Sequence, residues 1–400
     1  DVLLLIILGI LLNILGFDPS PFFISADILF EIALALILFE AGIHLKFNNL
    51  FSAIKSSTSL ILSTYGLTVV SILFFCQYIL ILSFHTSLIL GLIMASISPA
   101  VVIPVSRTMS ISERMKSNLI VESTITDVLS IFFVIALVGY GANYNNVYLS
   151  IFLKDFSIVF IKSVSIGILA AIIWSYIFDI IRNLPNTIFT SLAFIFILFG
   201  VAHYIHTSAP ITVLIFSMII SIPTDSRIRT FSKRINFNLI EFTESEKKFY
   251  EEILFIIKTF FFIFLGMKMS YLENIPGWTI ALFYIKAIGI TFVIFIIRFL
   301  SIKITKPKIN KNNQIVLLAM VPKGLAAAVL ISYYVTNINI DFSQSQELTY
   351  TTYSVILLSI FVSSVLIYIA EKRIKKEELN VPSKKTNYDN SMSSDKIENI

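Results

Sequence analysis

One carboxylate in this sequence, Asp127, lies deep inside an apolar stretch, in the run V-E-S-T-I-T-D-V-L-S of residues 121–130. The apolar stretch begins near Asn118, so Asp127 is about nine residues into it, or roughly 14 Å along a helix, near the centre of a hydrocarbon core about 30 Å thick. A charged group at that depth is costly and marks a functional site by default. A proton or a bound cation would each neutralise it, so we expect the two to compete for one site. The alternative is a structural Asp whose oxygens are hydrogen-bonded.

Hydroxyl groups beside Asp127 are candidate ligands for the same cation. Thr126 and Ser123 would supply neutral oxygens, and Ser130 is a further candidate. Hard cations prefer oxygen ligands, so these residue types suit a monovalent metal ion. The alternative, that each hydroxyl bonds a carbonyl of its own helix, stays open.

Two charged residues lie at matching depths in different apolar stretches. Glu122 and Arg298 each lie about a turn inside the same end of their segments, as measured by the helical rise. Arg is always charged and must be paired in an apolar environment, so we predict an ion pair between them. Separate snorkelling of both side chains to the interface is the alternative.

Other intramembrane charges are Glu40, in I-L-F-E-A-G-I-H-L, and Lys323, which follows Pro322. We expect Glu40 to be a direct ion ligand or to lie on the ion pathway, with snorkelling as the alternative. Lys323 would either hydrogen-bond carbonyls freed by a helix break or balance the charge of Asp127, and we favour the structural role. Glu31 lies nearer the outer end of its segment and is predicted to be interfacial.

The remaining residues exclude several chemistries. His44, His85, His203 and His206 are scattered and form no metal-ligand cluster in the sequence. The sequence has no phosphate-binding glycine loop, zinc spacing or nucleophile elbow, so we expect neither an enzyme nor a bound cofactor. Without a nucleotide motif, any transport would be secondary and driven by ion gradients.

The elements that position these residues are membrane helices. Of the 400 residues, 56% are hydrophobic and 14% are charged, which a soluble domain cannot accommodate. The predicted fold is an all-α polytopic membrane protein. Apolar runs predict about twelve spans. These spans are 2–16, 27–45, 58–83, 86–105, 118–140, 156–181, 187–206, 208–222, 250–269, 277–302, 313–335 and 350–370.

Two of these spans are interrupted in a similar way. The span 86–105 contains Ser98-Pro99, and the span 313–335 contains Pro322-Lys323-Gly324. Paired interrupted spans of opposite direction are the sequence sign of an inverted-repeat transporter. If each repeat carries its broken helix in fifth place, one span is missing before residue 1, and the absence of an initial Met fits that expectation.

Charge sets the expected orientation. Lys and Arg gather in the segments 107–116, 227–234 and 303–311 and in the tail, which places both ends of this chain in the cytoplasm. The net charge of +5 reflects these loops and does not indicate nucleic-acid binding. We predict one exchanger domain over 1–371, with a cytoplasmic loop or amphipathic helix at 223–249, and a disordered charged tail at 372–400.

Five segments occur in a recognisable order: L-F-E-A-G-I-H-L (38–45), I-S-P-A-V-V-I-P-V (97–105), V-E-S-T-I-T-D-V-L-S (121–130), I-I-R-F-L-S (296–301) and V-P-K-G-L-A-A-A-V (321–329). The first four resemble the motifs L-F-E-x-G-x-x-L, T-D-P-A-x-x-x-P, E-S-x-x-N-D and R-P-x-S of the NhaP-type cation/proton antiporters, the family that includes eukaryotic sodium/proton exchangers. The fifth resembles that family's second broken helix. The resemblance covers 1–371 in the family's order and spacing.

The resemblance implies a thirteen-span fold, here without its first span, in which a six-helix core moves like an elevator against a dimerising domain. It implies that Asp127 binds the ion and the proton, that Glu122 and Arg298 form a structural pair, and that Glu40 lies near the ion pathway. Na⁺, K⁺ or Li⁺ and H⁺ would be the substrates of a homodimer in the bacterial inner (plasma) membrane.

The sequence departs from the family's motifs at two positions. Ser98 stands where the family has Asp, and Thr126 stands where it has Asn. One central acid then remains, together with the Ser98 hydroxyl as a possible ligand, which favours electroneutral one-for-one exchange. The main hypothesis is therefore a cation/proton antiporter. The alternatives are a non-transporting ion or pH sensor on the same scaffold, and, ranked last, a sodium-coupled symporter for organic anions.

Overall fold

The computed structural model describes residues 2–17, 32, 35, 36, 38–40, 42, 43, 47–109, 111–140, 149–181, 187–205, 207–221, 244–270, 277–305, 311–338 and 340–380. Every secondary-structure element in this part of the chain is a helix. In chain order the helices are α1 (Val2–Ile14), α3 (Phe47–Phe74) with a π-helical turn η1 (Phe75–Ile79), α4 (Phe84–Ala95), α5 (Pro99–Thr108), α6 (Glu113–Tyr140), α7 (Leu149–Ile181), α8 (Thr187–Tyr204), α9 (Ala209–Ile220), α11 (Glu244–Ser270), α12 (Gly277–Thr305), α13 (Lys311–Ala319), α14 (Leu325–Asn337) and α15 (Phe342–Asn380).

The chain is a multi-pass membrane protein. Six helical stretches in the described residues are long and apolar enough to cross a bilayer, and four shorter apolar helices accompany them. Helices satisfy their own backbone groups, which is what the hydrocarbon core demands. Helices lie along each predicted span, two of which are formed by a pair of shorter helices; in 27–45 only some residues are described, and those are helical.

Both spans that contain an interruption in the sequence are broken in the structure. Residues 96–98 separate α4 from α5, and residues 320–324 separate α13 from α14. Pro99 is the first residue of α5, where the missing N–H of proline has no helical partner to lose. Gly324 caps the start of α14 in an extended conformation.

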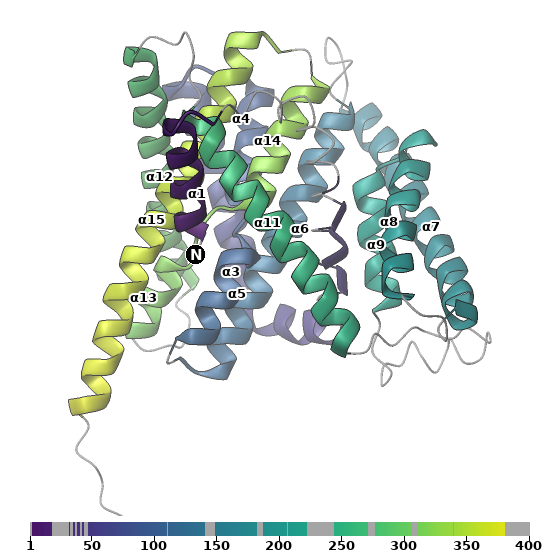
Figure 1. Cartoon of the computed structure of the whole chain (residues 1–400). Coiled ribbons are helices and arrows are strands. Elements are labelled where there is room, and N and C mark those ends of the chain that lie inside the picture. The colour runs from purple at the N-terminus through teal and green to yellow at the C-terminus, as the bar shows by residue number, and fades with distance from the viewer. Residues whose placement is uncertain are drawn as a thin grey trace, which may run out of the picture.

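The helices divide into groups that Figure 1 shows side by side. Helices α7, α8 and α9 pack on one another at one side of the molecule, and α11 crosses the front as a long tilted helix (Figure 1). Helix α1 packs along α11, where Gly9 meets Gly266. A Cβ on either glycine would run into the backbone of the facing helix, so this close crossing requires residues without a side chain.

The last helix is longer than its apolar span. Helix α15 continues to Asn380 and protrudes from the end of the bundle in Figure 1. Within the charged tail expected at 372–400, residues 372–380 are helical, because most residues of E-K-R-I-K-K-E-E-L-N (371–380) are good helix formers and none is proline. Residues 381–400, and most of the predicted loop or amphipathic helix at 223–249, lie outside the described residues, whereas 244–249 form the first turns of α11.

Candidate ion-binding site

The two helix breaks are bonded directly to each other. The backbone N–H of Ser98 donates to the carbonyl of Pro322 at 2.9 Å. The ammonium of Lys323 donates to the carbonyl of Ser96 at 2.7 Å, and the Lys323 side chain is buried. These bonds satisfy backbone groups that the breaks release inside the membrane, so each interruption stabilises the other.

Gly324 allows the breaks to approach this closely. A Cβ built on Gly324 would overlap the side chain of Ser98. Ser98 itself is buried, with only 3% of its surface exposed. The serine found where the family has Asp therefore packs against the opposite break.

Thr126 links helix α6 to the first helix break, residues 96–98, by a hydrogen bond. Its hydroxyl donates to the carbonyl of Glu122 at 2.9 Å and accepts the backbone N–H of Ile97 at 3.2 Å. The Thr126 hydroxyl therefore bonds its own helix, which was the alternative interpretation. It also accepts the N–H of Ile97, a backbone donor that would otherwise be unpaired.

The other predicted hydroxyl ligands are also bonded to carbonyls. Ser123 donates to Ile120 of its own helix at 3.0 Å. Ser130 donates to the carbonyl of Leu92 at 2.6 Å, which ties α6 to α4. Because each of these oxygens retains lone pairs, its hydrogen bond orients it without removing its capacity to accept.

Asp127 lies beside this junction with incomplete hydrogen bonding. Only 5% of the residue is exposed, and its Oδ1 has no hydrogen-bond partner among the residues described. The hydroxyl of Ser96 is also buried and makes no hydrogen bond in that part of the chain, and it lies close enough to Asp127 to interact with it. Buried polar atoms are normally satisfied, so two orphaned oxygens at one place have the chemistry of a site for a proton or a small cation.

Glu40 lies within electrostatic range of Asp127 and is paired with a residue that the sequence analysis missed. Lys258 of α11 contacts Oε2 of Glu40 at 2.6 Å, and both charges act on Asp127. Lys258 lies about eight residues into the predicted span that begins at 250, and so the depth argument used for Asp127 would also have found it.

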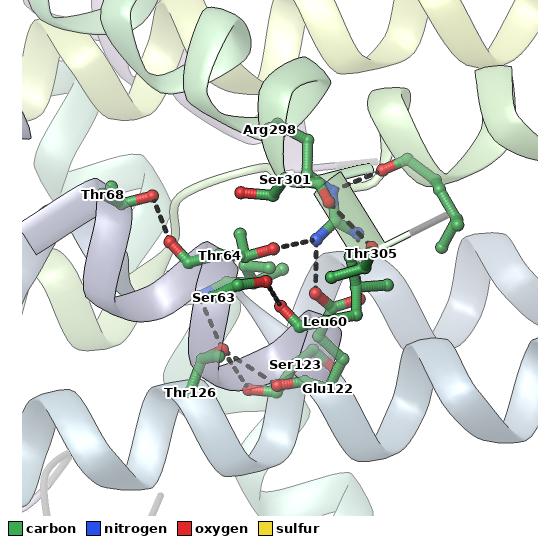
Figure 2. A network of polar contacts seen from close by, with 12 residues as sticks. Leu60, Ser63, Thr64, Thr68, Glu122, Ser123, Thr126, Arg298, Ser301 and Thr305 are labelled. Carbon is green, nitrogen blue, oxygen red and sulfur yellow. Dashed lines mark hydrogen bonds and ion pairs between the residues drawn. The ribbon is translucent and has the colours of Figure 1, made fainter. Parts of the chain in front are cut away.

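Glu122 and Arg298, whose side chains are both buried, meet in the network of Figure 2. The guanidinium contacts both carboxylate oxygens of Glu122. It also donates to the hydroxyl of Thr64 on α3 at 3.2 Å and to the carbonyl of Leu317 on α13 at 2.8 Å. Arg298 of α12 therefore connects α6, α3 and α13, and its bidentate contact is the strong form of an ion pair.

The remaining charged and histidine residues lie elsewhere. Lys286 of α12 pairs with Glu347 of α15, an ion pair that the sequence analysis also missed. His85 contacts the hydroxyl of Tyr334, and His203 is exposed. His44, His206 and Glu31 lie outside the described residues. Within the described ranges, no three His, Cys, Asp or Glu side chains gather around a possible metal site.

Two interrupted membrane helices that bond to each other beside a buried carboxylate are the arrangement of a secondary membrane transporter. The sequence matches the profile of the family described as sodium/hydrogen exchanger, transmembrane, over residues 1–370. The chain therefore belongs to the sodium/hydrogen exchanger family, and the resemblance drawn from the five segments is confirmed. No curated protein sequence matches the chain.

Solved structures share the fold. A structure of the sodium proton antiporter MjNhaP1 from Methanocaldococcus jannaschii at pH 8 aligns with a TM-score of 0.64 and 20% identity, covering 92% of this chain and 91% of that one. An electron microscopy structure of the same antiporter aligns with a TM-score of 0.67 and 18% identity, covering 94% and 91% of the two chains. At this identity the likeness concerns the fold alone.

Proposed function

We propose that the protein is a secondary antiporter that exchanges a monovalent cation, Na⁺ in the first instance, for H⁺ at Asp127. The observation that supports this most directly is the buried carboxylate with an unpartnered oxygen beside two bonded helix breaks. The family of the chain is a family of sodium/hydrogen exchangers, and the structurally similar MjNhaP1 is a sodium proton antiporter.

In this proposal Asp127 holds either a proton or the cation. The Ser96 hydroxyl is a neutral oxygen beside the carboxylate, Glu40 lies on the approach, and Thr126 and Ser123 hold α6 in register. A carboxylate in a low-dielectric site is stable only when its charge is matched. The site therefore moves across the membrane loaded with one ion or the other.

The charges around Asp127 support one-for-one exchange. Glu40 is paired with Lys258, whereas Asp127 is an acid with an unpartnered oxygen among the residues described. A proton or a monovalent cation adds one positive charge in either case. Exchange of one for the other then moves no net charge across the membrane.

The movement we propose is a shift of the helices around the breaks against the remaining helices. The Arg298 network joins α3, α6, α12 and α13 into one unit, because its bonds are buried and bidentate. Helices α1, α7, α8, α9 and α11 would form the opposing unit and the contact of a homodimer in the cell's inner (plasma) membrane. The excess of Lys and Arg in the loops on one side of the membrane supports a cytoplasmic location for both ends of residues 1–400.

The test is exchange in proteoliposomes that contain a pH-sensitive dye, with Na⁺, Li⁺ and K⁺ compared, with and without a clamped potential. The proposal predicts a cation-driven pH change that does not depend on potential and is absent in Asp127→Asn. Exchange retained by folded Asp127→Asn would exclude Asp127 as the site. Cation binding without any flux would favour the sensor alternative instead.

A further inference from the structure

Lys258 places a positive charge where an incoming cation would be attracted. It extends from α11 to Oε2 of Glu40 at 2.6 Å, and the two side chains are 19% and 23% exposed. The pair is therefore partly accessible, unlike the Glu122–Arg298 pair, whose side chains are 0% and 4% exposed. An ammonium group bound to a carboxylate has the same charge as a bound alkali-metal ion.

The pair also acts on Asp127. Both Lys258 and Glu40 lie near enough to that carboxylate for their charges to act on it. The Lys258 charge is thus shared between two acids that would otherwise both attract the transported cation. Charges interact strongly over such distances in a low-dielectric environment.

The two lysines differ in how firmly they are held. The Lys323 ammonium is buried against the carbonyl of Ser96, and its backbone N–H is bonded to the hydroxyl of Ser359. Among the residues that the structure describes, the Lys258 ammonium donates to a side chain, the carboxylate of Glu40. Its flexible four-carbon stem can move the ammonium toward water without disturbing a helix break.

We propose that Lys258 is a tethered competitor of the transported cation. It neutralises Glu40 when the site holds no cation, and it moves aside when a cation binds between Glu40 and Asp127. Lys258 would thereby set the apparent affinity for the cation and keep the empty site free of excess negative charge. This inference rests on the proposed antiport at Asp127.

The test is the equilibrium affinity of the purified full-length protein for Na⁺, measured by titration calorimetry at one fixed pH, together with the KM of exchange in proteoliposomes. Lys258→Met should bind Na⁺ roughly tenfold more tightly, since one nearby positive charge is removed. KM should fall in parallel, whereas Lys258→Arg should keep the wild-type affinity because it keeps the charge.

The matched control is Lys286→Met, which removes the lysine of another partly exposed Lys–Glu pair, one that lies in a different pair of helices. Lys286 and Glu347 are 24% and 26% exposed, and neither is among the groups that act on Asp127. Its Na⁺ affinity should equal that of the wild type. A tenfold change in this control would show that the effect of Lys258→Met is a general consequence of losing an intramembrane lysine, and would overturn the inference.

The outcomes separate the inference from the proposed function. Unchanged Na⁺ affinity in folded Lys258→Met, with exchange that still depends on Asp127, overturns the inference alone. If Lys258→Met does not fold, Lys258→Gln replaces it with the same expected result. Wild-type protein that neither binds nor exchanges a monovalent cation overturns both.

Discussion

The Glu122–Arg298 and Glu40–Lys258 pairs share their chemistry and differ in their surroundings. The first is fully buried, bidentate and bonded to two further helices (Figure 2). The second is partly exposed and joins single atoms. Two acid–base pairs in one membrane protein can therefore have separate tasks, one holding helices together and the other remaining exchangeable. The number of additional bonds and the degree of burial distinguish them, not the residue types.

The strongest test of this comparison breaks the buried pair. Arg298→Met leaves Glu122 buried without its partner, and removal of one member of a buried pair costs about 3–5 kcal/mol. We expect a large fall in the free energy of unfolding, measured by denaturation in detergent micelles. Stability equal to that of the wild type would show that the network does not hold these helices.

A second test asks how far the firmly held region extends from Arg298 toward Asp127. Thr126→Val removes the acceptor for the Ile97 N–H while keeping the side-chain shape. An unsatisfied buried donor costs about 1–3 kcal/mol, so the same denaturation experiment should show that loss. Thr126→Ser restores the hydroxyl and should recover most of it. If Thr126→Val is as stable as the wild type, the bond to the break is not structural.

The smallest effect on stability is expected at the Glu40–Lys258 pair. Lys258→Met should lower the free energy of unfolding by about 1 kcal/mol or less, since partly exposed pairs contribute little. Its effect should appear in cation affinity instead. A loss as large as that of Arg298→Met would remove the distinction between the two pairs.

The central features were predictable from the sequence because each is local. Asp127 and Arg298 are charges inside apolar runs, and Pro99 and Pro322 interrupt helices wherever the chain places them. One sequence expectation, for the tail, rested on composition without helix propensity. Charged residues after 371 resembled a disordered tail, although their helix propensity continues α15 to Asn380.

The contacts between distant segments could not be predicted in the same way. Lys258 is 218 residues from Glu40, and Ile97 is 29 residues from Thr126. The sequence around each of these residues does not indicate its partner, because the contact forms only when separate helices pack together. The same applies to Gly324, whose close approach to Ser98 exists only once the two breaks meet.

The most direct test of the account is proton release on cation binding. Purified protein in weakly buffered solution is titrated with NaCl while the pH is recorded, and Asp127→Asn is treated in the same way. Competition at one carboxylate predicts about one proton released per Na⁺ bound by the wild type at a pH where Asp127 is protonated, and none released by the variant. Equal release from both proteins would contradict the claim that proton and cation compete at Asp127.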